Sequence, residues 1–274
     1  RIFDPEYAAS PYFGQIIPRR EIRITSGDDV QYFGSIDDWN LNYEPTGDNY
    51  SEAVCSDGFR ILANQTLDGF TNSVELSGDR VSAILSRPEI DWGIDARDID
   101  AGRQTLGADV VEAGDNVLSY LQTVEASEPG ALFIGKSGKV TFKDRAVAPT
   151  SDVTVLADDG TGISYQGMQV VYGSELLYNN IEIGTVITGA TSSAVDSLSQ
   201  GIYGNLTLSQ TDLLMETNQD ALELAEWYAR LYSSPEFRFE SVNIILNDLT
   251  TDEQNEILAL EIGSVVKVVF TPGN

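Results

Sequence analysis

Four aspartates lie close together in the middle of the chain, at Asp91, Asp95, Asp98 and Asp100. Carboxylate oxygens are the hard ligands that Ca²⁺ prefers, so such a group can bind a cation. The spacing does not match an EF-hand loop, because the glycine and the distal glutamate are misplaced. Four neighbouring carboxylates also arise by chance in a chain with 43 acidic residues. We therefore predict no metal site and no cofactor.

Paired carboxylates could also hydrolyse glycosidic bonds, with Trp39, Trp92 and Trp227 as platforms for sugar rings. Such a site needs two carboxyl groups at a set separation, and a chain this acidic allows any pairing to be drawn. Trp39 falls on a predicted strand and Trp227 on a predicted helix, which favours packing in a core. The chain has no histidine, which excludes Ser-His-Asp and Cys-His catalysis and His-ligated zinc. We predict that the protein is not an enzyme and has no catalytic residues.

A phosphate-binding pattern, GxxxxGKS, is matched letter by letter at residues 130–137. The motif binds phosphate only where a helix follows it, because the helix N-terminus binds the anion. Here Leu132 and Ile134 are predicted to face Val140 and Phe142 across a turn, which is the pattern of a β-hairpin. We interpret the match as coincidental and predict no cofactor-binding residue.

The single cysteine, Cys55, excludes a disulfide within the chain and a thiolate metal cluster. It lies in a predicted strand without a lysine or histidine neighbour. We expect it to be a small buried apolar residue.

The net charge of −27, with 43 acidic against 16 basic residues, is unusual for 274 residues. So acidic a surface repels nucleic acid, and we predict no specific nucleic-acid binding. Two interpretations remain open. Dense carboxylates are typical of halophile proteins, which are adapted to concentrated salt, and they also form a repulsive wall along which a polyanion slides. We expect the acidic residues to coat the outer surface, with a modestly acidic inner wall where the protein surrounds a polyanion. No apolar run is long enough to span a membrane.

Hydrophobic periodicity divides the chain into three parts. Residues 1–76 alternate polar and apolar residues in short strands, at 21–25, 31–36, 39–43 and 51–56. Residues 77–148 change to helical spacing, with one helix capped by Ser77 and a second capped by Asp115, before the hairpin at 131–142. Strands return in residues 149–274, with a long loop predicted at 188–200.

The strongest helical pattern in the chain runs from Thr217 to Leu231. The apolar face of this helix consists of Ala221, Leu224, Ala225, Tyr228 and Leu231. We expect this face to pack against strands of the C-terminal module, and a further helix to begin at a capping box of Thr250 and Glu253.

The order of elements between Ser77 and Arg145 resembles the middle of hub-type minor tail proteins from long-tailed phages and related viruses. Other segments resemble the same actinophage-type family: Arg1-Ile-Phe-Asp-Pro5, Ser10-Pro-Tyr-Phe-Gly14, residues 32–39, 221–229, 232–235 and 260–268. These are packing and turn motifs and touch most of the chain. The similarity is weakest in residues 152–214.

The resemblance implies a mainly β fold with an α+β insert, in which two tube-like β-barrel modules flank a small helix-plus-hairpin domain. The modules are expected at residues 1–76, 77–148 and 149–274, with residues 217–231 as the packing helix. The start at Arg1 lacks a strand usual in the family, so the first barrel is expected to be incomplete or to be completed by residues outside this chain.

The same resemblance implies a structural virion protein of the tail tip, a baseplate hub. Its subunits form a ring with one another, a homotrimer, which joins the tail tube to distal tail and fibre proteins and surrounds the conduit for DNA ejection. Tail-tube, distal-tail and tape-measure proteins are the expected neighbours. The alternative is a receptor- or carbohydrate-binding β module of a virion or cell surface, with Tyr43, Tyr50, Trp92 and Tyr203 as candidate exposed aromatic residues.

Overall fold

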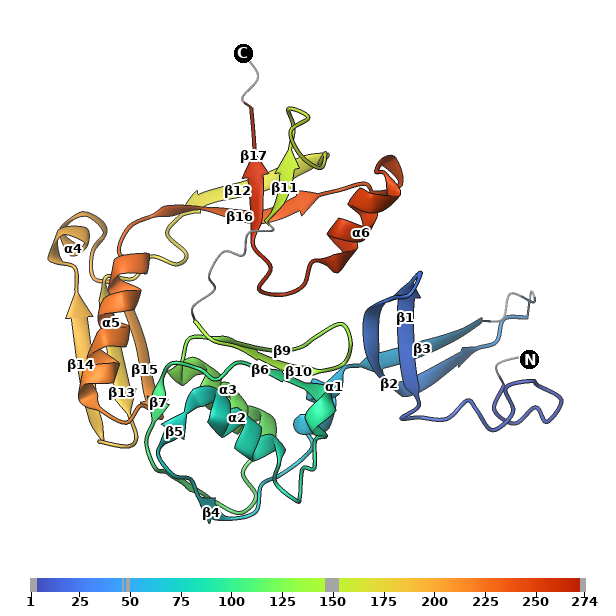
Figure 1. The fold of residues 1–274 in the computed structure, drawn as a ribbon, viewed down its shortest axis with the longest axis horizontal. Helices are drawn as coiled ribbons and strands as arrows, with labels where there is room; N and C mark the ends of the chain where they lie inside the picture. The colour runs from blue at the N-terminus through green and yellow to red at the C-terminus, as the bar shows by residue number, and fades with distance from the viewer. Residues whose placement is uncertain (1–3, 46, 48–49, 146–152, 272–274) are drawn as a thin grey trace.

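An antiparallel three-stranded sheet opens the computed structural model, which describes residues 4–45, 47, 50–145 and 153–271 (Figure 1). The strands are β1 (Glu21–Ser26), β2 (Asp29–Asn42) and β3 (Tyr50–Ser56), in the order β1-β2-β3. Gly27 has φ +59° in the β1–β2 turn, a conformation that glycine adopts without strain. The sequence predicted two strands where β2 is continuous. The register between β2 and β3 shifts after Ile36, and this irregularity keeps both halves of β2 paired with β3.

The middle body packs two helices, α2 (Ser77–Leu85) and α3 (Val117–Ser127), against a mixed sheet of order β6-β10-β9. The strands of this sheet are β6 (Arg97–Ile99), β9 (Ala131–Ile134) and β10 (Val140–Lys143). Its smaller elements are α1 (Gly58–Leu62), β4 (Phe70–Thr71), β5 (Glu75–Leu76), η1 (Ile94–Ala96), β7 (Thr105–Leu106) and β8 (Val110–Val111). The predicted hairpin is confirmed, since Val140 pairs with Ile134 and Phe142 with Leu132.

The core of the middle body lies between α2, α3 and the hairpin, with Leu85, Leu121 and Phe142 fully buried. It also takes in Leu62 and Leu67, which precede the expected module boundary at residue 77. The boundaries at residues 76 and 148 stay a prediction. The packing favours a division in which residues 58–76 join the insert.

The helix starts in this body differ from those predicted. Ser77 does not cap α2, because it lies inside the helix and its hydroxyl donates to Glu128 Oε2 at 2.6 Å. The cap of α3 is Asn116 rather than Asp115, and the Asn116 side chain accepts the Ser119 N–H at 3.0 Å. Residue type does not separate these two adjacent capping residues, but the extended backbone of Asn116 is the conformation that an N-cap adopts.

A third body consists of the sheet β14-β13-β15 with helix α5 (Asn218–Tyr232) on one face. Its strands are β13 (Asn180–Thr185), β14 (Ala190–Val195) and β15 (Thr207–Leu213). The loop predicted at residues 188–200 is wrong, because this stretch forms β14 and the start of α4 (Ser197–Tyr203). Small side chains such as Ala194 let α5 approach β14 closely.

Helix α5 is confirmed within one residue of its predicted bounds. Thr217 and Asp220 form a capping box, and Leu224 is fully buried in the core between α5 and the sheet. Leu231 was predicted to share that buried face but is 39% exposed. In the last turn Tyr232 packs against the core instead.

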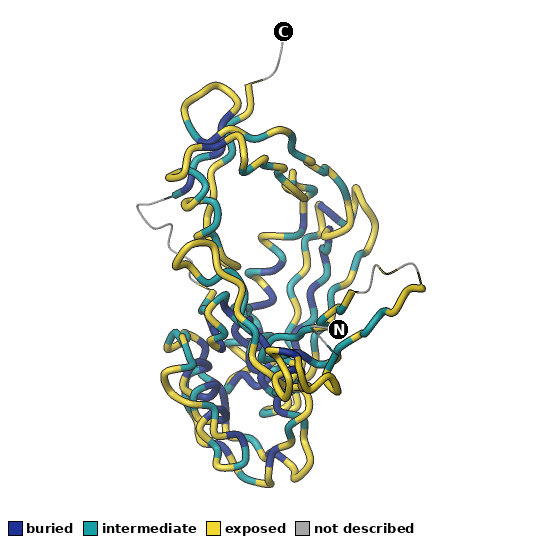
Figure 2. The backbone as a smooth tube through the Cα atoms, turned by 90° about the vertical axis from the view of Figure 1, so that its right-hand side faces the viewer, coloured by how far each residue is buried: buried dark blue, intermediate teal, exposed yellow. Residues whose placement is uncertain are grey.

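The remaining residues form two strand pairs and a helix around a small core of Leu156, Ile163 and Leu249. These elements are β11 (Thr154–Ala157), β12 (Gly167–Gly173), β16 (Glu236–Asn243), η2 (Leu246–Asp248), α6 (Thr251–Ala259) and β17 (Val266–Val269). Strand β11 pairs parallel with β17, and β12 pairs antiparallel with β16. Figure 2 shows that this upper part of the molecule is mostly exposed, whereas buried segments gather lower down.

The protein is mainly β, as predicted, but the expected closed barrels are not formed by the described residues. Their sheets contain two or three strands each, and every sheet ends in open edges. A closed barrel needs on the order of eight strands around one axis. The described strands do not close into such a barrel, because they are divided among separate sheets of two or three strands.

Candidate functional site

The four aspartates of the predicted acidic group do not converge. Asp98 and Asp100 flank Lys143, whose Nζ lies 3.0 Å from Asp98 Oδ2 and 3.4 Å from Asp100 Oδ1. Although burial alone would lower the pKa of Lys143, hydrogen bonds and charge from the two carboxylates raise it. Among the described residues, no three acidic or cysteine side chains are grouped as metal ligands. Asp98 and Asp100 therefore form ion pairs with Lys143.

The tryptophans and the cysteine serve packing more than recognition. Trp39 donates its Nε1–H to the carbonyl of Ile17 at 3.3 Å, and Trp92 donates to the carbonyl of Ala96 at 3.1 Å. Trp227 packs against the core of the third body. Cys55 is half-buried, not buried as expected, and burial raises the pKa of its thiol.

A buried arginine is the most elaborate polar site, and sequence reasoning missed it. Arg80 is fully buried on α2, on the same stripe as Ser77, Val81 and Ile84. All five N–H groups of Arg80 are satisfied, by Glu75 Oε1, Asp109 Oδ1 (2.7 Å), Tyr120 Oη (2.8 Å), the Ser73 carbonyl (2.7 Å) and the Gly107 carbonyl (3.0 Å). The sequence offered one signal for this site: Arg80 stands at a position of the α2 pattern where an apolar residue is expected.

Charge and burial act in opposite directions on this network. Burial alone would lower the pKa of Arg80, but the facing Tyr120, Glu75 and Asp109 raise it. Burial raises the pKa of Tyr120, and Asp109 adds to this effect. Every N–H group of Arg80 is used within the protein, so none remains free to bind a ligand. The network links the segments at residues 73–75 and 107–109 to helices α2 and α3.

A second buried carboxylate, Glu128, closes the N-terminus of α2. Its Oε2 accepts the Ser77 hydroxyl at 2.6 Å and the N–H groups of Arg103 and Gln104 at 2.9 and 2.7 Å. The negative charge is well placed there, because the helix dipole is positive at that end. The carboxylate is completely buried, and its other oxygen, Oε1, has no hydrogen-bond partner among the described residues.

The strongest candidate for an interaction site is the strand pair β12–β16. Val170 pairs with Phe239 and Tyr172 with Phe237, so these four side chains share one face. Phe237 is 72% exposed and Tyr172 60% exposed, and their rings lie 4.7 Å apart. We call this set of four residues the ribbon face. The alternation of residues in the sequence favours strands at 168–172 and 237–246, but it does not reveal that these two strands pair.

The ribbon is incomplete as a structure. Both strands have an unpaired outer edge, and a two-stranded sheet is marginally stable on its own in water. On the opposite side of the ribbon, Arg238 pairs with Glu175 at 2.9 Å. The ribbon face therefore has the exposed apolar side chains and unpaired strand edges of a surface that a partner could cover.

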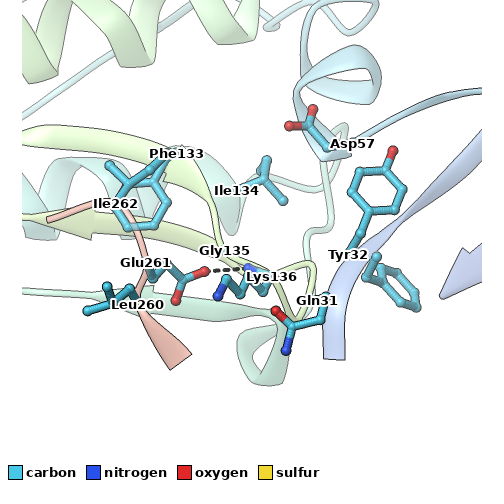
Figure 3. A pocket seen from close by; sticks show the side chains of 11 residues that line it. Gln31, Tyr32, Asp57, Phe133, Ile134, Gly135, Lys136, Leu260, Glu261 and Ile262 are labelled. Carbon is cyan, nitrogen blue, oxygen red and sulfur yellow. Dashed lines mark hydrogen bonds between the residues drawn. The ribbon is translucent and has the colours of Figure 1, made fainter. Parts of the chain in front are cut away.

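A pocket of about 340 Å³ lies where three parts of the chain meet (Figure 3). We call it the junction pocket; its apolar lining is Tyr32, Phe33, Phe133, Ile134, Leu260 and Ile262. At its floor the Lys136 N–H donates to Glu261 Oε1 and the Lys136 Nζ donates to the Leu258 carbonyl. The hairpin turn thus joins the middle body to the segment after α6. This turn is the one that matched the phosphate motif, and it continues into β10 rather than a helix.

Comparison with known proteins gives a result for the fold. No family model matches the sequence, and no curated protein matches it significantly. Among solved structures, the chain is similar to the 43 kDa tail protein of prophage MuSo2 from Shewanella oneidensis and to the tail protein from Neisseria meningitidis MC58. The fold is shared with prophage tail proteins.

The similarity covers most of this chain. The TM-scores are 0.56 and 0.55 at 14% identity in both cases, over 82% and 76% of this chain. The match spans 67% of the Shewanella protein and 62% of the Neisseria protein, so the chain corresponds to about two thirds of each. None of the helices in the described ranges combines the length and apolar character that a bilayer crossing requires.

Proposed function

We propose that the protein is a structural component of a phage-type tail, a hub at the tail tip whose copies form a ring around the DNA conduit. The ring is a trimer that joins the tail tube to distal tail proteins, with tape-measure-type proteins as further neighbours. The protein carries out no catalysis in this role. The shared fold with two prophage tail proteins supports the proposal.

The ribbon face is the observation that carries the proposal. Four apolar side chains on an uncovered face beside two open strand edges are costly to leave in water. A neighbouring copy would pack apolar side chains against the face, and its strands would pair along the open edges and extend the sheet. Closure of such sheets around a ring would also supply the strand number that each separate sheet lacks for a tube-like barrel.

The proposal is tested first by the mass of the purified protein. Light scattering should give three copies for the wild type and a monomer for Phe237→Ser combined with Phe239→Ser. Val110→Ser is the control, because Val110 is also exposed but lies on β8 in the middle body. A wild-type protein that stays monomeric with or without salt would contradict the ring.

Location is tested separately on intact particles. Antibody-labelled virions should show the label at the tail tip by electron microscopy. Label along the tail shaft or on the capsid would overturn the tip assignment, even if a ring is found in solution.

A receptor- or carbohydrate-binding module is the second candidate. Tyr43, Tyr50 and Tyr203 are exposed, as this alternative expects, whereas Trp92 is half-buried. Glycan binding that is lost in Tyr43→Ala and Tyr50→Ala variants, without ring formation, would favour this alternative. A ring without glycan binding favours the hub.

A further inference from the structure

Helix α4 presents an apolar surface that no other described part of the chain covers. Leu198 and Ile202, one helical turn apart, are 84% and 73% exposed, and Val195 lies beside Leu198. We call these three residues the α4 knob. Residues 197–203 contain no charged side chain, although the chain carries a net charge of −27.

The knob is held rigidly. Asp196 caps α4 by accepting the N–H groups of Leu198 and Ser199, both at 3.0 Å. The fully buried Asn179 donates to Ser199 Oγ at 3.1 Å and to the Gly204 carbonyl at 2.8 Å, so both ends of the helix are anchored. A rigid apolar projection loses little entropy on binding, which is the property of an interface anchor.

The junction pocket is the complementary feature. It is concave and lined mainly by aromatic and aliphatic side chains, and it is open enough to admit a side chain from outside. In Figure 1, α4 lies at the left edge of the molecule, whereas the hairpin β9–β10 and strand β2, which line the pocket, lie to the right. The two features therefore belong to different sides of the same chain.

The charges beside the two features also match. Arg230 is exposed next to Leu198 and has no ion-pair partner among the described residues. Asp57 and Glu261 line the junction pocket. Lys136 also lines the pocket, with its Nζ bound to the Leu258 carbonyl. The two carboxylates outnumber this one cation, so Arg230 of a second copy would meet a net negative lining, which favours this contact in a chain whose copies otherwise repel one another.

We infer that the α4 knob of one copy inserts into the junction pocket of the next. This contact deepens the proposed function and rests on it, because it names how neighbouring copies of the ring meet. A contact between two different surfaces is head-to-tail, and head-to-tail contacts close into a ring when the rotation between copies permits. The two-fold alternative, knob against knob, would give only a dimer.

Disulfide trapping separates these arrangements. In a Cys55→Ser background, which removes the only native thiol, Leu198→Cys and Ile262→Cys are prepared as separate proteins and then mixed. Under mild oxidation the mixture should give a cross-linked pair containing one of each. The double variant should give a ladder that ends at the copy number of the ring. Cross-linking of Leu198→Cys with itself would establish the two-fold contact and overturn the inference.

Assembly measurements provide the second readout. Leu198→Asp should raise the concentration for half-assembly at least about tenfold, because it places a charge in an apolar pocket. Val110→Asp, an equally drastic change at an exposed valine, should leave assembly unchanged. A ring that forms normally with Leu198→Asp and gives no mixed cross-link would end this inference while leaving the tail role intact. A wild-type chain that never assembles would end the ring itself.

Discussion

Arg80, in a chain with few basic residues, connects several structural elements through its side chain. A buried charge is tolerated only when its hydrogen bonds are complete, and all five donors of Arg80 have acceptors. The planar guanidinium reaches two helices and two strand segments at once. A lysine offers three donors in a different geometry.

Arg80→Lys should therefore lower the free energy of unfolding by about 3–5 kcal/mol, because Glu75 and Asp109 lose much of their pairing. Urea denaturation measures this change. The control is Arg103→Lys, whose side chain is 60% exposed in a pair with Asp144 and should cost less than about 1 kcal/mol. Equal effects of the two variants would mean that the Arg80 network contributes little.

Tyr228 makes the free energy of unfolding depend on pH in the alkaline range. Burial, followed by the neighbouring Tyr232, raises the pKa of Tyr228 from 10 to about 12. The unfolded chain therefore releases this proton at lower pH than the folded protein. The contribution of Tyr228 is complete below pH 10 and is lost as the pH rises from 10 through 12, by up to about 1.4 kcal/mol per pH unit.

Tyr228→Phe should flatten this loss, which is measured by urea denaturation at several pH values between 10 and 12. Tyr203→Phe, at an exposed tyrosine, is the control and should keep the wild-type slope. If Tyr228→Phe also keeps that slope, another group causes the alkaline loss.

At the scale of elements, helix α5 holds the third body together. Leu224→Ala should cost about 2–5 kcal/mol, because it leaves a cavity between the helix and the sheet. Leu231→Ala, on the partly exposed last turn, should cost less than about 1 kcal/mol. Chemical denaturation of the two variants is the test. A Leu224→Ala change within about 0.5 kcal/mol of wild type would show that the site is open to solvent.

The turn between β9 and β10 brings the N-terminal sheet against the middle body. Gly138 has φ +84°, and a Cβ there would overlap the Phe33 ring of β2. Gly138→Ala should therefore cost more than the roughly 1–2 kcal/mol of left-handed strain. Denaturation of the variant measures this cost.

Gly160→Ala supplies the control for that measurement. Gly160 has φ +82° with nothing near a new Cβ, so its variant reports the backbone strain alone. Phe33→Ala in the Gly138→Ala background should remove the additional cost. Equal costs at Gly138 and Gly160 would indicate that the sheet can move away from the turn freely.

At the scale of the whole molecule, charge opposes assembly. Three copies carry three times −27, or −81, and their repulsion extends about 30 Å at 0.01 M salt but only about 3 Å at 1 M. We expect the proposed ring, once isolated, to be more stable in molar salt than in dilute buffer. Light scattering across salt concentrations measures this.

The position of the acids within the ring separates the two explanations of the charge. An even outer coat favours adaptation to salt, and an acidic inner wall favours sliding of DNA. Our expectation remains an outer coat with a modestly acidic lumen, to be checked in a structure of the ring. Equal stability at low and high salt, with no inner or outer bias, would contradict both explanations.

The sequence by itself determined the elements whose signal is local. Helix α5 follows from the spacing of Leu224 and Tyr228, and the hairpin follows from alternation around a glycine turn. The absence of histidine limits the available chemistry whatever the fold, because no arrangement of the chain can supply an imidazole. The helix and the hairpin depend on residues a few positions apart, so periodicity alone reveals them.

Only the tertiary structure decided which distant segments meet. The sequence predicted a loop where β14 forms, because its serines and threonines become a strand only by pairing with the buried β13. The partners of Arg80, the ribbon face and the junction pocket all join residues far apart in sequence, and the sheets remained open where barrels were expected. Pairing between distant strands is set by the packing of the whole chain, and no local pattern of residues encodes it.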